Sequence, residues 1–535
     1  MTLPSFWKMN RKKRINSANR EKSGQSNDIP QHILVTNLES NLKILRNITG
    51  NSSDIIIRRL MIEAIHRQGA IVYLDGLVNT DIISESLMES LIHEKSVMNE
   101  YSKANLLQII QEKIITVGDI KTVRQLDELF HHLLSGEAII LIDGFDTALS
   151  ASTRGGEIRQ VQEPSTELTV RGPRDGFTES IRTNTALVRR RIKNPNLWLE
   201  SMKIGKVTKT DVNIMYIHGI ADEAVVSEVR NRLKKIDIDS ILESGYIEQF
   251  IEDKTFTIFP TIYHSERPDV IAANILEGRV AIFVDGTPFV MVAPALFIQF
   301  FQAAEDYYSR SDISTAIRFL RVIVFFISLI GPATYVAVTT FHQEMIPTLL
   351  VITITAQREA VPFPAIIEAI IMEVTFEILR EAGLRLPRPI GQAVSIVGAL
   401  VIGQAAVQAG LVSPAMVIVV SITAIASFAT PSFAIAISAR LIRFIIMLLA
   451  AVLGFYGVMI GLIWMAIHLC SLRSFGVPYM SPVAPLIRKN LLDTVIRAPI
   501  WLMKERPRLI SQKNMNRVGR AQYPPEINKG EKNED

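Results

Sequence analysis

The chain has 535 residues, of which 48% are hydrophobic and 21% are charged, and its formal net charge at pH 7 is +4. A mean hydropathy of +0.25 is too low for a transporter embedded in a membrane along its whole length. A single cysteine, Cys470, excludes an intramolecular disulfide framework and a cysteine-based zinc site.

Residues 1–50 are polar and rich in lysine and arginine, and they predict a disordered basic tail. An alternative is a polybasic segment held on an anionic membrane surface. The start of the chain lacks the apolar core of a signal peptide, so we expect the soluble half to stay in the cytoplasm.

An internal duplication follows, and it predicts two related α/β units at 51–150 and 200–305. Two strand sequences in the first unit recur in the second at offsets of 143 and 142 residues. They are IVYLDG at 71–76 with IMYIHG at 214–219, and GEAIILIDG at 136–144 with GRVAIFVDG at 278–286. Each apolar run ends at a glycine turn, which is typical of strands that alternate with helices around a small sheet.

The soluble half shows no catalytic motif. The sequence contains neither G-x-x-x-x-G-K-[ST] nor G-x-G-x-x-G, and its histidines lack the spacing of metal ligands. Asp75, Asp143 and Asp285 precede glycine and are better explained as turn residues. We therefore predict no enzyme activity, no cofactor, no metal site and no nucleic-acid partner.

Residues 151–199 are predicted to be an arginine-rich linker followed by a helix that starts after Thr178. One interpretation is a solvated linker with an ordinary amphipathic helix. The other is a docking surface for a neighbouring copy of the chain, because so many arginines need partners. The candidate interface residues are Arg174, Arg182, Arg189 and Arg190.

Residues 310–475 predict an all-α bundle of about five transmembrane helices. The clearest apolar run, at 441–465, has no acidic residue and exceeds the roughly 20 residues needed to cross about 30 Å of hydrocarbon. The candidate spans are 317–340, 363–379, 390–412, 415–437 and 442–470, with further apolar segments at 288–301 and 345–355. The arginine clusters favour a cytoplasmic soluble half.

The number of spans conflicts with the charge of the C-terminal region. Five crossings would place the basic polar tail at 476–535 outside the cell. Either one predicted span does not cross, or a further apolar segment enters the membrane.

The second span contains three acidic residues, Glu368, Glu373 and Glu377. A charge at membrane depth costs about 2.5–3.5 kcal/mol on insertion scales, so such residues usually face water or partners. The helix could lie on the membrane surface, or it could form the wall of a cation path. Gln404 and Gln408 share a face of the third span and are further candidates for lining a pore.

Three long strings resemble the A subunit of the GerA-type spore germinant receptors. They are EPSTELTVRGPRDGFTESIRTN at 163–184, RLPRPIGQAVSIVGALVIGQAAV at 385–407 and SLRSFGVPYMSPVAPL at 471–486. The resemblance covers about residues 52–508. It implies a protein of the inner spore membrane that senses nutrients together with a transporter-like B subunit and a C lipoprotein, and that forms a homo-oligomeric ion channel. A secondary transporter subunit and a non-conducting scaffold are the alternatives.

Overall fold

The structure, a computed structural model, describes residues 33–93, 107–108, 110–111, 115, 117–155, 162–164, 166–386, 403–511 and 514–519. The chain divides into two compact units. The first holds residues up to 156 together with 193–195, and the second holds 157–192 and the chain from 196 onward.

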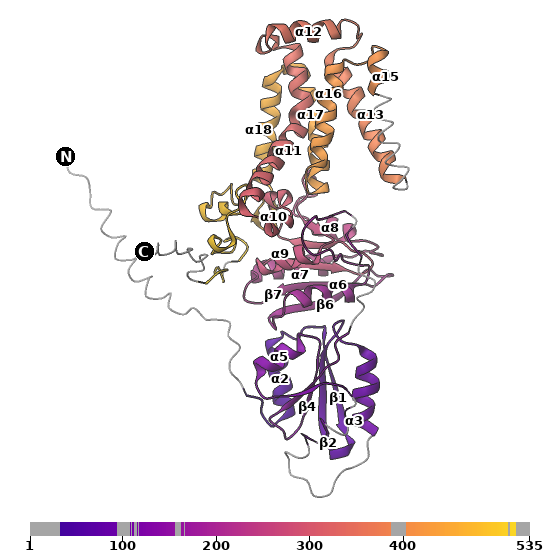
Figure 1. Cartoon of the computed structure of the whole chain (residues 1–535), viewed down its shortest axis with the longest axis vertical. Coiled ribbons are helices and arrows are strands. Elements are labelled where there is room, and N and C mark those ends of the chain that lie inside the picture. The colour runs from indigo at the N-terminus through magenta and orange to yellow at the C-terminus, as the bar shows by residue number, and fades with distance from the viewer. Residues whose placement is uncertain are drawn as a thin grey trace, which may run out of the picture. The chain divides into compact units, whose positions relative to one another are not determined.

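The first unit is built on a five-stranded antiparallel sheet in the order β1-β2-β4-β5-β3. Its strands are β1 Ile55–Ile62, β2 Arg67–Leu74, β3 Ile120–Val123, β4 Ala138–Ile142 and β5 Ala148–Ala151. Helices α2 (Leu38–Ile48) and α5 (Leu126–Leu133) lie on one face, and η2 (Ile82–Met88) with α3 (Glu89–His93) lies on the other (Figure 1). Covering both faces explains why β4 is apolar at every position rather than at alternate ones.

The second unit contains a sheet with the order β6-β7-β9-β10-β8. Its strands are β6 Leu197–Ile204, β7 Thr210–Ile217, β8 Tyr263–Ser265, β9 Val280–Val284 and β10 Val290–Ala293. Helices α6 (Ile181–Arg191) and α9 (Pro268–Leu276) pack on one face through Leu187, Ile271 and Phe283. Helices α7 (Glu223–Lys235) and α8 (Ser244–Ile251) pack on the other through Val226, Ile247 and Ile282.

The two sheets share both strand order and pairing register. Ile71 pairs with Ile140 in the first sheet, and Ile214 pairs with Ile282 in the second, at the offsets that the sequence gives. The likeness extends to the helix that precedes each sheet. Asp143 accepts a hydrogen bond from the first backbone N–H of α2, and Asp285 accepts one from that of α6, at 3.1 Å in both cases.

Helices α2 and α6 show that each α/β unit starts before its predicted first residue. Helix α2 lies inside the predicted 1–50 tail, but it buries Leu38, Leu42 and Leu45 against the first unit. Helix α6 lies inside the predicted 151–199 linker, but its apolar residues belong to the core of the second sheet. The α/β units therefore begin earlier than 51 and 200.

Apolar helices follow the second sheet within the second unit. They are α11 Ser311–Thr340, α12 Thr348–Arg358, α13 Ala365–Arg385, α15 Gly403–Gln408, α16 Pro414–Phe428, α17 Phe433–Leu453 and α18 Phe455–Ser471. Among the residues described, α11 and α17 are long and apolar enough to cross a membrane, and α16 and α18 are apolar but shorter. Most of the predicted third span, up to residue 402, lies outside the described part of the chain.

The predicted spans at 415–437 and 442–470 have the wrong boundaries. Helix α16 ends at Phe428 and α17 starts at Phe433, so the chain breaks beside Pro431. Gly454, with a φ of +58°, then separates α17 from α18, so the run at 441–465 is not one helix. A Cβ on Gly457 would lie 2.0 Å from the carbonyl oxygen of Leu449, so α17 and α18 form a tight antiparallel hairpin.

The further apolar segment at 288–301 is not a separate span. It contains β10, which lies between β9 and β8, and η4 (Phe297–Phe301). The other segment, 345–355, falls largely in α12, which buries none of its residues.

Within the predicted polar tail at 476–535, the described residues up to 511 fold back onto the second sheet unit. The hydroxyl of Tyr479 donates to Pro260 O at 2.6 Å, and that of Ser511 donates to Ile220 O at 2.8 Å. The end of α18 therefore lies on the same side of the helical bundle as the sheet. The bundle is thus entered, at α11, and left, at α18, at the same end.

Candidate functional site

A buried ion pair joins α13 to α17. A carboxylate oxygen of Glu373 lies 2.6 Å from Nη1 of Arg443, and these side chains are 0% and 1% exposed. Nε of Arg443 donates to Ser328 O of α11 at 2.5 Å. Glu373 and Arg443 therefore hold three helices together.

A second pair lies one turn along the same two helices. A carboxylate oxygen of Glu377 lies 2.6 Å from Nη1 of Arg440. Residues three and four apart share a helix face, so Glu373 and Glu377 meet Arg443 and Arg440 in order along the antiparallel helices. We call Glu373, Glu377, Arg440 and Arg443 the α13–α17 charge cluster.

The charge cluster is incompletely hydrogen-bonded. Within the described chain, one carboxylate oxygen of Glu373 and one of Glu377 are buried without a hydrogen-bond partner, as are one guanidinium nitrogen of Arg443 and one of Arg380. Arg380 instead lies over the rings of Phe428 and Phe433, at 5.3 and 5.5 Å. Buried polar groups without partners are costly and usually mark a strained or functional site.

The other predicted pore residues lie apart from this cluster. Glu368 is buried, accepts a hydrogen bond from Ser413 N at 2.8 Å, and lies 3.3 Å from Nε of Arg358. Because Ser413 caps the N-terminus of α16, Glu368 fixes the start of that helix. Gln404 and Gln408 are exposed on α15. The three glutamates therefore do not form one exposed stripe in this structure.

Sequence reasoning identified the acids but missed their partners. Arg440 and Arg443 belong to the arginine clusters that suggest membrane orientation in the sequence, but they lie inside the apolar helix α17. One signal in the sequence points to the pairing. The two arginines are three residues apart and the two acids are four residues apart, and both spacings place the two side chains on one face of a helix.

A short loop of the second sheet unit, between α8 and β8, contacts the apolar helices. We define residues 257–261 as the junction loop. Its backbone carbonyls at Ile258 and Thr261 accept hydrogen bonds from Ser438 of α17 at 2.6 Å and from Ser474, just after α18, at 2.7 Å. Together with the bond from Tyr479 to Pro260, these contacts tie the sheet to the hairpin of α17 and α18.

The base of α11 carries a second buried ion-pair network. Arg318 lies 2.8 Å from a carboxylate oxygen of Asp306 and 2.9 Å from one of Asp493. Arg321 also reaches Asp306 at 2.8 Å. The network joins α10 (Glu305–Tyr308), α11 and the C-terminal region.

The candidate interface arginines differ in exposure. Arg174 is exposed and lies 3.3 Å from Glu163, Arg182 is also exposed, and Arg190 is half-buried. Arg189 is only 1% exposed and belongs to the interior of the second unit. Its candidacy as a docking residue is therefore corrected, because a side chain buried in its own unit cannot reach a neighbour.

No group of three or more histidine, cysteine, aspartate and glutamate side chains that could hold a metal ion occurs among the described residues. The sheets, the bundle of apolar helices and the buried charge pairs define a class of protein that combines an α/β part with a helical apolar part.

The chain belongs to the Bacillus/Clostridium GerA spore germination protein family, which matches residues 43–509. It is 59% identical to spore germination protein KA of Bacillus subtilis, over 94% of this chain and 92% of that protein. It is 39% identical to spore germination protein GerLA of Bacillus cereus, over 89% and 96% of the two chains. These are germination proteins rather than enzymes, so family membership confirms the prediction that the chain is not an enzyme.

One solved structure is also similar. It is the N-terminal domain of the A subunit of the Bacillus megaterium spore germinant receptor GerK3, at 50% identity and a TM-score of 0.41. The match covers 51% of this chain and all of that one.

Proposed function

We propose that the chain is an A-type membrane subunit of a nutrient germinant receptor and that several copies form a cation channel that triggers spore germination. Its partners are a transporter-like B subunit, a C lipoprotein and further copies of itself. The proposed location is the inner spore membrane or the cell membrane, with the sheet units on the cytoplasmic side. The family and the names of its members support the role in germination.

The path of the chain supports a multi-pass arrangement. The helical bundle begins at α11 and ends at α18 on the side of the second sheet, where the junction loop and the C-terminal region meet. An even number of crossings places the basic residues near the start of α11, such as Arg321, and those after α18, such as Lys489, at the same end of the bundle.

We infer that the two α/β units descend from one ancestral unit. The support is the common strand order and the preserved pairing register, which extend to the aspartates that contact α2 and α6.

The α13–α17 charge cluster carries the channel proposal. Burying ion pairs among apolar helices brings a desolvation cost that often exceeds the attraction between the charges, so such pairs are poor devices for stability alone. In the structure, the arginines neutralise Glu373 and Glu377. Movement of α13 away from α17 would release both carboxylates to line a hydrated path, where rings of carboxylates attract cations.

The experiment measures cation release from germinating spores that carry Glu373→Gln. We expect the variant to insert and assemble, because the amide oxygen of glutamine can still accept a hydrogen bond from Arg443, but to release cations more slowly, because one carboxylate per subunit is lost. The matched control is Glu381→Gln, on the same helix but exposed and paired with Arg385. Normal release from Glu373→Gln spores would overturn the pore role of this residue.

A second experiment tests access to the site. Cysteines placed at 373 and 377, with the native Cys470 replaced, should react with a water-soluble thiol reagent only after the germinant is added. If neither position reacts in either state, neither carboxylate faces a hydrated path.

The arginine-rich segment is the proposed contact between copies. Replacing Arg174, Arg182 and Arg190 together should lower the yield of cross-linked oligomer in membranes. An unchanged yield would return this segment to the role of a solvated linker.

A further inference from the structure

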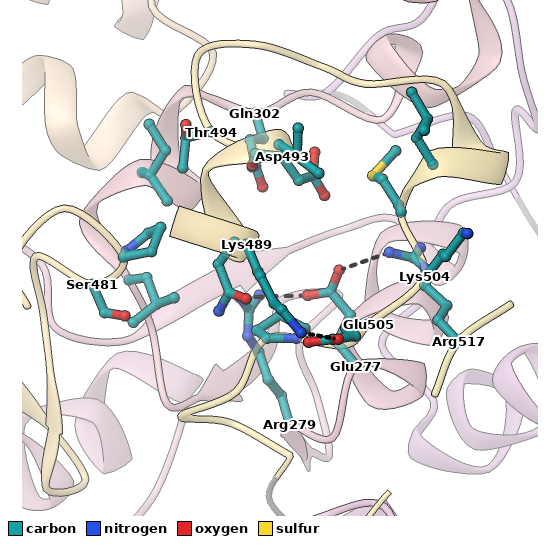
Figure 2. Close-up of a pocket in the computed structure, with 18 residues that line it drawn as sticks. Glu277, Arg279, Gln302, Ser481, Lys489, Asp493, Thr494, Lys504, Glu505 and Arg517 are labelled. Carbon is teal, nitrogen blue, oxygen red and sulfur yellow. Dashed lines mark hydrogen bonds and ion pairs between the residues drawn. The ribbon is translucent and has the colours of Figure 1, made fainter. Parts of the chain in front are cut away.

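A cavity of about 240 Å³ lies between the second sheet unit and the C-terminal region that covers it (Figure 2). Glu277 and Arg279, just before β9, form one side of it. Residues between Ser481 and Arg517 form the other. Sites for small molecules are typically about 300–1,000 Å³, so this cavity suits a small metabolite rather than a peptide.

On the polar side of the cavity, two guanidinium groups share a single carboxylate. Figure 2 shows Glu277 between the guanidinium groups of Arg279 and Arg517, at 3.5 and 3.7 Å. Both distances are too long for a hydrogen bond. Lys489 pairs with Glu505 at the rim. Asp493 is already bound to Arg318 and to the hydroxyl of Tyr307.

Arg279 is incompletely satisfied although it is buried. The residue is 4% exposed, and its Nη1 donates to the side chain of Asn274. Its Nε has no hydrogen-bond partner among the residues that the structure describes. A buried guanidinium donor left open beside a cavity is a site for an acceptor.

The position equivalent to Arg279 in the first unit is occupied by a glutamate whose carboxylate is hydrogen-bonded by its neighbours. Glu137 stands 142 residues before Arg279, at the same place ahead of the central strand. Its carboxylate is bound by His132, Ser150 and Arg154, at 2.6 to 2.7 Å. In the second unit, this position carries the positively charged Arg279 in place of a carboxylate, and its side chain lines the cavity.

Part of the remaining cavity wall is apolar, and the other part is formed by polar side chains such as Gln302 and Thr494. Leu296 and Ile298 come from the segment after β10, and Leu492, Leu502 and Met503 come from the C-terminal region. A ligand that fits both sides has an apolar body and one anionic group.

We propose that this cavity is a binding site for a small organic anion, with the anionic group held by Arg279 and Arg517 and the apolar body held by the leucine-rich wall. Burial raises the pKa of Glu277, which lies between these two arginines. The proposal concerns binding alone and does not depend on ion conduction. Bound ligand would join the sheet unit to the C-terminal region, whose Asp493 holds the base of α11.

The test uses three probes that share one ring and differ in charge, namely benzoate, benzyl alcohol and benzylammonium. Binding to the purified full-length chain in lipid nanodiscs is measured by equilibrium dialysis. We expect saturable binding of benzoate and about tenfold weaker binding of the other two, since a charge-assisted hydrogen bond is worth roughly that factor.

Arg517→Gln is the decisive variant, because this side chain is one-third exposed and its loss should leave the fold intact. It should weaken benzoate binding about tenfold, as should Arg279→Gln where that variant folds. Arg174→Gln is the matched control, because Arg174 is exposed and does not line the cavity. It removes the same charge, so it shows how far net charge and uptake of the probes into lipid affect the measured binding. Equal binding of the three probes, or benzoate binding unchanged in Arg517→Gln, would overturn the proposal.

Discussion

Removal of either partner of the Glu373–Arg443 pair should cost far more stability than removal of both. Arg443→Met leaves the Glu373 carboxylate fully buried beside an apolar side chain, and Glu373→Leu leaves Arg443 with only its bond to Ser328 O. Breaking a buried ion pair from one side typically costs about 3–5 kcal/mol. We expect each single variant to lose stability in that range.

The double variant Glu373→Leu with Arg443→Met should come within about 2 kcal/mol of the original chain. Neither of these two charges then remains buried, and apolar replacements of buried pairs are often neutral or stabilising. Ser328 O lies inside α11, so it keeps its place in the helical hydrogen-bond ladder. The coupling energy between the two sites should therefore be several kcal/mol.

The assay is equilibrium unfolding of the purified chain in detergent, analysed as a double-mutant cycle. The matched control is the exposed pair of Glu381 and Arg385, with side chains 60% and 80% exposed and 2.7 Å apart. Its cycle should give at most about 1 kcal/mol. Additive losses in the Glu373 and Arg443 cycle would refute the buried pair as the link between α13 and α17.

Three further predictions concern other parts of the chain. Gly457→Ala should lower the free energy of unfolding by at least about 3 kcal/mol, because the new methyl group would clash with the backbone at Leu449. Gly118→Ala is the control and should be close to neutral, because its methyl group meets no atom within 4 Å. Equal effects of the two variants would contradict the tight hairpin. Tyr479→Phe removes the hydrogen bond to Pro260 O and should cost about 1 kcal/mol in the same assay, and an unchanged value would show that this bond does not hold the junction loop. Burial raises the pKa of Glu167 from 4.5 to about 7, so the unfolded chain loses this proton first and stability should fall as the pH rises from 4.5 to about 7. Glu167→Gln should flatten that slope in unfolding measured across pH, and the same slope in both chains would refute the assignment.

The sheet units could be predicted because their signal is local. Strands buried on both faces give short apolar runs, and each run ends in a glycine turn that the duplicate repeats at a fixed offset. Helix α2 was missed because only a few of its residues, such as Leu42 and Leu45, are buried within an otherwise polar stretch.

The helical part was harder to predict because hydropathy does not record where a helix breaks. Gly454 and Pro431 interrupt the backbone without interrupting the apolar composition on either side. The partners of Glu373 and Glu377 lie 70 and 63 residues further along the chain, and no local pattern connects them. Pairing across helices is decided by packing, which a single sequence does not display.

The return of the C-terminal region to the second sheet bears on the order in which the protein can be made. Ser511 binds Ile220 and Arg506 binds Leu276, partners that are separated by 291 and 230 residues. Because chains fold from the N-terminus as they are synthesised, the first unit can be complete early. The second unit must wait, with the surface around Ile220 and Leu276 uncovered, until every apolar helix has left the ribosome. Its last contacts therefore form only after the whole helical part has been made, and a chain that ends before residue 506 would lack Pro507 and Arg517 from the wall of the cavity beside Arg279.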